Sequence, residues 1–294
     1  MTGGNPYPVG VTAAALLLVF GAAVLHAGWN ALTKRAADPV VFLWWVGVVA
    51  SVLYAPFALA VLTRHGFSLT AVPFVVGTVV LHALYFFTLG RAYATGDLSL
   101  VYPIARGLGV ALVPVAARAL FDERLSPLGT LGVTLVAAGI FGLHWRPGAW
   151  SRTAFLASGT GWALTTGVLI ASYSLLDKAG VARLHPLAYI WLMELGSCAL
   201  LAPVALAKAD VVRREWRVNR RTIGAAALMS PTGYLLVLFA FQFSKTGYVV
   251  AARELSIVLS AVIGSVWLRE GHLGRRLAGA AVVLAGVGCV ALAR

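Results

Sequence analysis

The sequence predicts an all-helical integral membrane protein, and its composition and the spacing of its apolar segments are the two observations that predict this class. Of its 294 residues, 60% are hydrophobic and only 11% are charged. A soluble domain carries about 25% charged residues, and much of its surface must still face water. The composition therefore excludes an ordinary cytosolic enzyme and a disordered chain.

Ten apolar segments are long enough to cross a bilayer, for which a helix needs about 20 mostly apolar residues. The ~10-residue alternation that is typical of membrane β-strands is absent. We therefore expect a helical bundle with short loops, apart from one polar connection, residues 208–221, that lies on the membrane surface. The expected spans are residues 10–34, 39–63, 70–91, 97–118, 125–145, 154–177, 186–207, 222–243, 247–268 and 273–293.

The two halves of the chain match each other when the sequence is shifted by 147 residues. Trp44 then aligns with Trp191, and Arg106 aligns with Arg253. Each half holds five spans, and an odd number makes the second half enter the membrane from the opposite side. The sequence therefore predicts two inverted five-helix repeats, a common plan of secondary transporters that places the substrate site near the midplane. The predicted repeats are residues 1–147 and 148–294.

Two arginines occupy matching positions inside predicted spans, Arg106 in PIARG and Arg253 in AARELS. An arginine at the centre of a span costs about 2.5–3.5 kcal/mol on insertion scales, so such residues are candidates for function. A guanidinium group is a planar fork that suits a carboxylate or a phosphate. Two interpretations remain open: the pair binds an anionic group of a substrate, or each arginine bonds carbonyl groups or a buried glutamate and holds the bundle together.

Two glutamates also lie within predicted spans, Glu194 in WLMELG and Glu254 directly after Arg253. A carboxylate in apolar surroundings can load and release a proton, so both are candidates for proton coupling. The alternative for Glu194 is a neutral or hydrogen-bonded core residue. Adjacent helix residues point about 100° apart, so we expect Arg253 and Glu254 on different faces, with Glu254 either pairing with Arg106 or carrying a proton.

A polar stripe marks the end of the first span, where His26, Asn30 and Lys34 recur four residues apart and Trp29 flanks them. Residues at this spacing share one helix face, so we expect the stripe to line a cavity or a seam between helices. His82 and Tyr85 form a second such pair in the third span. Both histidines are either proton relays or interhelical hydrogen-bonding groups, and Lys34 and Lys178 are expected to extend to the membrane interface.

Prolines indicate possible helix breaks at Pro231, in the segment SPTGY of residues 230–234, and at Pro103 beside Arg106. Proline removes a backbone hydrogen bond, and a break exposes carbonyl groups to a substrate. The expected substrate-binding residues are Arg106, Arg253, Asn30, Trp29, Tyr85 and Tyr234. The expected proton-coupling candidates are Glu194, Glu254, His26 and His82.

The sequence shows no metal-ligand spacing, no phosphate-binding loop and no arrangement of nucleophile and base. We therefore expect neither an enzyme nor a cofactor or metal, and we interpret Asp122 and Glu123 as helix caps or loop anchors. The net charge of +13 lies mostly in short gaps between apolar runs, which fits lipid headgroups rather than nucleic acid. The expected partners are a small-molecule substrate, the lipid bilayer and coupling protons.

Three motifs carry a resemblance to a known family: WNALTK at residues 29–34, the turn AYATG at residues 92–96, and the junction FDERLSPLGTLGVTLVAAG, which returns as WLREGHLGRRLAGAAVVLAG. The chain resembles the EamA family of the drug/metabolite transporter superfamily over nearly its whole length. The family's Gly-Glu before the fifth and tenth spans is here Asp122-Glu123 and Arg269-Glu270, which keeps the glutamate and loses the glycine. The resemblance implies ten spans in two repeats and ATP-independent export or exchange of metabolites, amino acids or drugs.

The resemblance also implies a protein of the inner or plasma membrane with both termini in the cytoplasm, whereas the excess of basic residues in the loops favours the opposite orientation. The leading hypothesis is a secondary transporter of a small polar, anionic metabolite that works by alternating access. The alternatives are an exporter of cationic or amphipathic compounds with Glu194 as the key charge, a flippase of a lipid-linked intermediate, and a membrane scaffold, against which the matched arginines speak.

Overall fold

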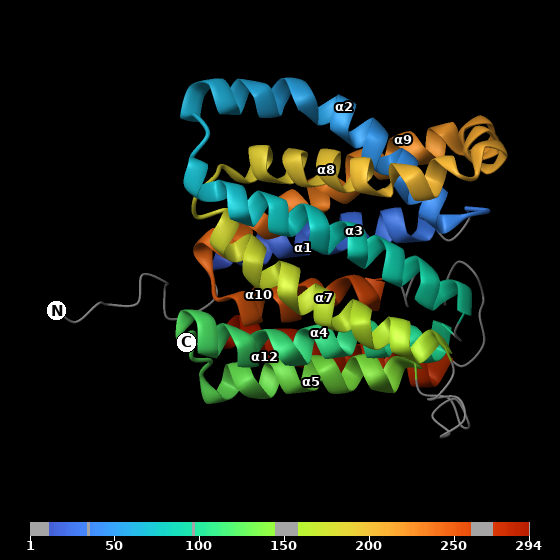
Figure 1. Ribbon diagram of the computed structural model, residues 1–294. Coiled ribbons are helices and arrows are strands. Elements are labelled where there is room, and N and C mark those ends of the chain that lie inside the picture. Colours follow the sequence, from blue (N-terminus) through green and yellow to red (C-terminus); the bar gives the residue numbers. More distant parts are fainter. Residues whose placement is uncertain (1–11, 34–35, 96–97, 145–157, 260–272, 294) are drawn as a thin grey trace.

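The computed structural model describes residues 12–33, 36–95, 98–144, 158–259 and 273–293, and these form a bundle of long helices without a strand (Figure 1). The all-helical class predicted from composition is confirmed. The elements in chain order are α1 (Ala13–Thr33), α2 (Pro39–His65), the 3-10 helix η1 (Leu69–Ala71), α3 (Val72–Thr95), α4 (Leu98–Phe121), α5 (Pro127–His144), α7 (Ser158–Gly180), α8 (Pro186–Leu206), α9 (Ala209–Phe243), α10 (Thr246–Arg253) and α12 (Leu273–Leu292).

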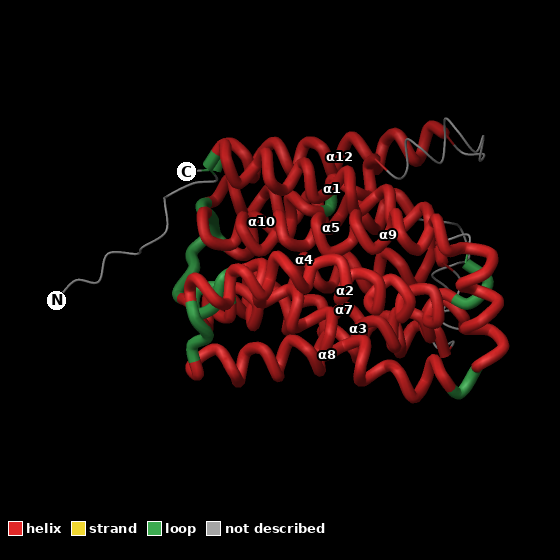
Figure 2. Tube along the Cα trace, turned by 90° about the horizontal axis from the view of Figure 1, so that it is seen from above, coloured by secondary structure: helices red, strands yellow, loops and turns green. Residues whose placement is uncertain are grey.

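Eight of the ten expected spans coincide with a described helix to within four residues at each end. By length and composition, six segments among the described residues are suited to cross a membrane. Apart from the turn that follows α10, the described turns gather at the two ends of the bundle, and α1 begins at the end where α12 finishes (Figure 2). The six segments are Ala13–Asn30, Pro39–His65, Leu69–Ala92, Ile104–Phe121, Pro186–Leu206 and Ala209–Phe243.

The polar connection expected at residues 208–221 is instead the first part of α9, which runs without interruption for 35 residues. At 1.5 Å per residue this is about 52 Å, more than the ~30 Å of a bilayer core. The segment is helical because it packs against α2: Trp45 Nε1 donates a hydrogen bond to the carbonyl of Val212 at 3.1 Å, and Trp45 stacks on Trp216. Its arginines occupy the outer face of the helix, which made the segment look like a loop.

The ninth span departs from expectation because α10 ends at Arg253 and the chain turns at Glu254 before helix resumes at residues 255–259. The N–H of Glu254 bonds to the carbonyls of Ala251 and Ala252, which tightens this turn. By contrast, α4 continues through Pro103 and α9 continues through Pro231. The helix break that the sequence predicts at Pro103 or Pro231 is therefore found instead at Glu254, which is buried.

The crossing of α2 and α8 contains the same contact twice. Trp44 Nε1 donates to the carbonyl of Cys198 at 3.2 Å, and Trp191 Nε1 donates to the carbonyl of Ser51 at 2.9 Å. The donors are 147 residues apart (191 − 44), and so are the acceptors (198 − 51). Each helix thus donates to the other the same kind of hydrogen bond that it accepts. Such reciprocal contacts are the geometry of a two-fold interface.

The contact between α5 and α12 repeats in the same way through glycines. A Cβ at Gly132 would lie 2.7 Å from the carbonyl oxygen of Gly286, and one at Gly139 would lie 3.1 Å from that of Gly279. The separations 286 − 139 and 279 − 132 are again 147. Higher numbers on α5 meet lower numbers on α12, so the two helices run antiparallel with their backbones in close contact.

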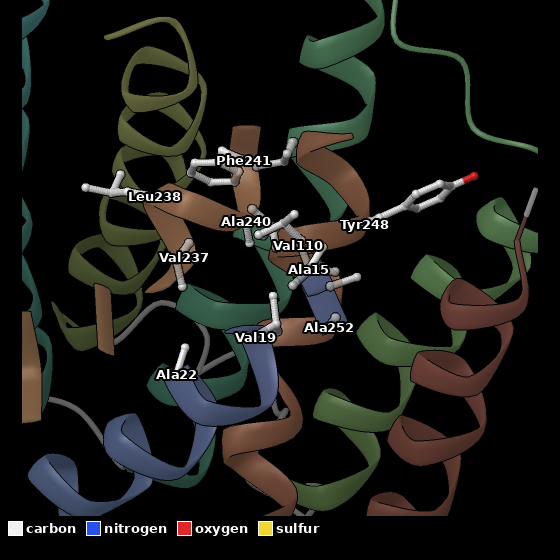
Figure 3. Packing of buried hydrophobic residues seen from close by; sticks show 14 of the residues in the cluster. Ala15, Val19, Ala22, Val110, Val237, Leu238, Ala240, Phe241, Tyr248 and Ala252 are labelled. Carbon is white, nitrogen blue, oxygen red and sulfur yellow. The ribbon is translucent and has the colours of Figure 1, made fainter. Parts of the chain in front are cut away.

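The packed core of the bundle lies where α1, α4, α9 and α10 meet (Figure 3). Val19 of α1, Val110 of α4 and Val237 of α9 are all buried there, as is Ala252 near the end of α10. This packing holds the short helix α10, and with it Arg253, against the longer helices.

Asp38 caps α2, which begins at Pro39, and accepts hydrogen bonds from the N–H groups of Val40 and Val41. It also lies 2.6 Å from Nζ of Lys208, which joins the start of α2 to the start of α9. Partial burial alone raises the pKa of the Asp38 carboxyl, but the Lys208 ammonium and the two backbone N–H groups outweigh this and hold the pKa below its usual value.

We expect Gly139→Val to lower the thermal unfolding temperature of the protein in detergent by several degrees, because the added side chain meets the backbone of α12 and overpacking costs about 1–3 kcal/mol. Gly142→Val is the matched control on the same helix, since a Cβ at Gly142 meets nothing within 4 Å. Equal unfolding temperatures for the two variants would contradict the close contact of α5 and α12.

We expect Asp38→Asn to lower the unfolding temperature at neutral pH, because asparagine keeps the cap and loses the ion pair with Lys208. A pKa that is lower in the folded state gives stability that is present above the unfolded pKa and is lost as the pH falls through the folded pKa. The difference from wild type should therefore shrink below about pH 4. Asp122→Asn, at a carboxylate that is 79% exposed, is the control and should show little effect at any pH.

Candidate functional site

A cavity of about 50 Å³ lies among α1, α3, α7, α8, α9 and α10. Since about 10–15 Å³ of such space holds one ordered water, the cavity has room for a few waters or for one polar group of a ligand. Seven of the ten residues expected at the site line it: His26, Trp29, His82, Tyr85, Glu194, Tyr234 and Arg253. Asn30, Arg106 and Glu254 are not part of its lining.

Aromatic rings form one wall of the cavity. The ring of His82 lies 4.3 Å from that of Tyr173 and 5.5 Å from that of Tyr234, measured between centroids. Tyr85 packs on Tyr173 edge to face at 5.4 Å. These rings come from α3, α7 and α9, so the wall joins three helices. Tyr173 was not expected at the site, although Asp177, four residues further along the same span, gives it a polar neighbour at helical spacing.

Arg253 brings a positive charge to this cavity from the last residue of α10. Its side chain is 3% exposed, and among the described residues its Nε and one terminal nitrogen have no hydrogen-bond partner. The nearest carboxylate oxygen is Oε1 of Glu254, at 3.7 Å from Nε. A buried charge without such partners is costly, so this guanidinium is suited to an anion that enters the cavity.

Arg106, the other half of the expected arginine pair, is engaged elsewhere. Its Nε lies 2.9 Å from Oε2 of Glu254 and a terminal nitrogen lies 2.8 Å from Oε1, which is a two-pronged ion pair. Of the two roles expected for Glu254, the geometry is that of pairing with Arg106. In agreement with the expectation of different faces, Arg253 lines the cavity and Glu254, on the turn after α10, does not, although Nε of Arg253 still lies 3.7 Å from Oε1 of Glu254.

Glu194 of α8 lines the cavity and lies close to Gly47 of α2. Its side chain is 8% exposed, and a Cβ at Gly47 would lie 3.7 Å from its Oε2. The two positions are 147 residues apart (194 − 47). Within the described part of the chain no ion pair reaches this carboxylate. A matching glutamate at position 47 would place two carboxylates together, and glycine avoids this.

The polar stripe of α1 reaches the cavity only in part. Trp29 Nε1 donates to Nδ1 of His26 at 3.2 Å, and both side chains line the cavity. The Asn30 amide instead donates to the carbonyl of His26 at 2.9 Å, so it satisfies its own helix. Lys34 lies outside the described residues.

Asp177 of α7 belongs to this region and sequence reasoning missed it. Its side chain is fully buried, and it accepts hydrogen bonds from the hydroxyls of Tyr189 at 2.8 Å and Tyr234 at 2.5 Å. It is the last residue of the span expected at residues 154–177, where an acidic group is easily taken for an interfacial one. The available signal was that this span holds no other Asp, Glu, Lys or Arg.

Lys178 does not extend to the membrane interface as expected. It is buried, and its Nζ donates to the carbonyls of Phe241 and Ser244 at 2.7 Å each. Its Nζ also lies 3.6 Å from Oε1 of Glu123. Glu123 accepts bonds from the N–H and the hydroxyl of Thr246, and so caps α10 in the way expected from the sequence. These bonds tie the end of α7 to the turn between α9 and α10.

In comparisons with known proteins, two protein families match different parts of the chain. The EamA-like transporter family matches residues 157–292, and the Small Multidrug Resistance protein family matches residues 43–136. The chain is a member of the drug/metabolite transporter superfamily. As such a member it is an integral membrane transporter, which agrees with its apolar helices.

The fold of this superfamily member also matches known structures, and 28 chains resemble it. One crystal structure superposes with a TM-score of 0.73 at 19% identity, over 95% of this chain and 97% of that chain. At this identity the similarity shows the fold alone. A comparison with curated proteins finds no match.

We expect Arg106→Gln to destabilise this transporter by about 3–5 kcal/mol, because removing one partner leaves the other charge buried. The loss should fall toward the lower end of that range, since Arg253 lies 3.7 Å from the freed carboxylate. The double variant Arg106→Gln/Glu254→Gln should recover much of the loss. Arg124→Gln, at a side chain that is 70% exposed, is the control, and thermal unfolding in detergent measures all four proteins.

Proposed function

We propose that this superfamily member is a secondary transporter that exports or exchanges a small polar, anionic metabolite by alternating access. Arg253 would contact the anionic group, with Trp29, Tyr85 and Tyr234 forming the surrounding wall. The observation that carries the proposal is the buried Arg253 guanidinium at the cavity, which lacks hydrogen-bond partners for two of its nitrogens among the described residues.

The charge balance among the three residues of the arginine–glutamate cluster supports an anion. Arg106, Arg253 and Glu254 are all buried, and together they carry two positive charges and one negative charge. Arg106 holds both oxygens of the carboxylate at hydrogen-bond distance, whereas Arg253 approaches it only to 3.7 Å. The positive charge that is not compensated is therefore that of Arg253, which lines the cavity. A carboxylate, phosphate or phosphonate group of a ligand would balance it there.

We further propose that residues 1–147 and 148–294 are inverted five-helix repeats that exchange conformations during transport. The reciprocal tryptophan contacts of α2 and α8 support a two-fold relation, as do the reciprocal glycine contacts of α5 and α12. The start of α2 at Pro39 and of α8 at Pro186, 147 residues later, supports the same register. Such a relation lets one sequence pattern form a cavity that opens first to one side and then to the other.

We also propose that the protein lies in the inner or plasma membrane with both termini in the cytoplasm, as the family resemblance implies. The exposed arginines of α9, Arg213, Arg214 and Arg217, favour the other orientation. A tag fused to the C-terminus and probed for accessibility in intact cells distinguishes the two orientations.

A thermal-shift screen of the purified protein in detergent tests the anion site. A ligand that binds only the folded state raises the apparent stability, so we expect acetate, inorganic phosphate or methylphosphonate to raise the unfolding temperature of wild type. Arg253→Gln should abolish that rise. Arg217→Gln, an exposed arginine of α9, is the matched control and should keep it.

The same screen tests the second candidate function, export of cationic compounds. Glu194 favours this function, because its buried carboxylate faces the same cavity and no ion pair reaches it within the described residues. Stabilisation by tetraethylammonium that is lost in Glu194→Gln and kept in Arg253→Gln would overturn the anion proposal and favour the cation exporter. Stabilisation by anions that persists in Arg253→Gln would also contradict the site.

A further inference from the structure

Behind the aromatic wall of the cavity lies a buried carboxylate without a fixed counter-charge. Among the described residues, the ion pair that reaches Asp177 comes from His82, with Nε2 at 4.0 Å from Oδ2. The neighbouring Lys178 is turned away toward the carbonyls of α9. A buried carboxylate is stabilised by hydrogen-bond donors and by a nearby partner that can carry a positive charge.

His82 is arranged as that partner. Its Nδ1 lies 3.1 Å from the carbonyl oxygen and 3.0 Å from the hydroxyl oxygen of Thr78, so either tautomer of the neutral ring finds a partner there. Its Nε2 faces the Asp177 carboxylate. One added proton, on Nε2 or on the carboxylate, changes the pair from a charge of minus one to zero.

We propose that Asp177 and His82 form a proton-binding site, and that Tyr234 connects this site to the cavity. The proposal rests on the proposed function in one respect, which is that the bound proton accompanies transport. It adds Asp177, which the sequence did not indicate, and it assigns the coupling proton to this pair rather than to Glu194 or Glu254.

The hydrogen bonds of Asp177 explain how the site senses the cavity. Tyr189 of α8 donates to Oδ1 and Tyr234 of α9 donates to Oδ2, so the carboxylate joins three helices. Tyr234 and His82 also line the cavity, which Tyr189 does not. An anion that attracts the Tyr234 hydroxyl would remove one donor from the carboxylate, and its charge would favour a proton on His82.

Titratable groups from several helices surround the pair: Tyr85 of α3 packs on His82, and His26 of α1 and Glu194 of α8 line the same cavity. Tyr173 of α7 packs against the rings of both His82 and Tyr234. Arg253 of α10 lines the same cavity as His82 and Tyr234. Two positive charges on Arg253 and His82 would repel each other, and an anion bound to Arg253 would reduce that repulsion. Anion binding and proton binding therefore favour each other.

Infrared difference spectra of the protein between about pH 5 and about pH 8, on either side of the usual range of histidine, test the site directly. Wild type should show a reversible, pH-dependent change in carboxyl and imidazole bands. Asp177→Asn and His82→Gln should each remove or alter that change. Glu194→Gln is the matched comparison, a second buried carboxylate of the same cavity, and it should remove only the carboxyl bands of Glu194 and leave the imidazole bands unaltered.

Several outcomes would overturn the proposal. These are a wild-type spectrum without the change, a change removed by Glu194→Gln alone, and a change that only one of the two pair variants affects. If Asp177→Asn does not fold, Tyr234→Phe is measured in its place. This variant should still show the pH-dependent spectral change, with the midpoint of that change at a different pH from wild type. No substrate is present in this measurement, so its failure and the failure of the anion site at Arg253 are distinguishable.

Discussion

The ion pair between Arg106 and Glu254 determines what the cavity presents to a ligand. Each charge alone would be costly in the interior of a membrane protein, and together they satisfy each other through two short contacts. Because the carboxylate is oriented toward Arg106, it leaves Arg253 at 3.7 Å with its charge only partly compensated. The two arginines at matching sequence positions therefore differ: Arg106 is held in an ion pair, and Arg253 lines the cavity.

The turn at Glu254 is part of the same arrangement. A continuous helix through residues 253 and 254 would point the two side chains about 100° apart, and the carboxylate would not reach both arginines. Ending α10 at Arg253 lets Glu254 bond with α4 while Arg253 faces the cavity. At the other end of α10, Glu123 and Lys178 hold its first turn, so this short helix is fixed at both ends by buried charges.

Two kinds of charged group meet at the cavity. Arg253, Glu194 and His82 line it, and His82 in turn faces Asp177. The rings of Tyr173 and Tyr234 pack against His82 and against each other. A polar ligand and a proton can then influence each other electrostatically without sharing a binding site. Alternating access further requires a bundle that has two stable packings, and the reciprocal contacts of α2 with α8 and of α5 with α12 are suited to this.

The sequence by itself determined the helical class, the positions of most helices, the 147-residue register and seven residues of the cavity lining. These follow from hydropathy and from the cost of polar groups in lipid, which act locally along the chain. Only the tertiary structure decided that Arg106 belongs to Glu254, that the ninth span breaks at Glu254, and that Lys178 is buried. It also decided that Asp177 receives two tyrosines and faces His82. The reason is that the interaction of a buried charge depends on its distance in space from other charges and donors. In this protein those groups come from helices that are far apart in the sequence.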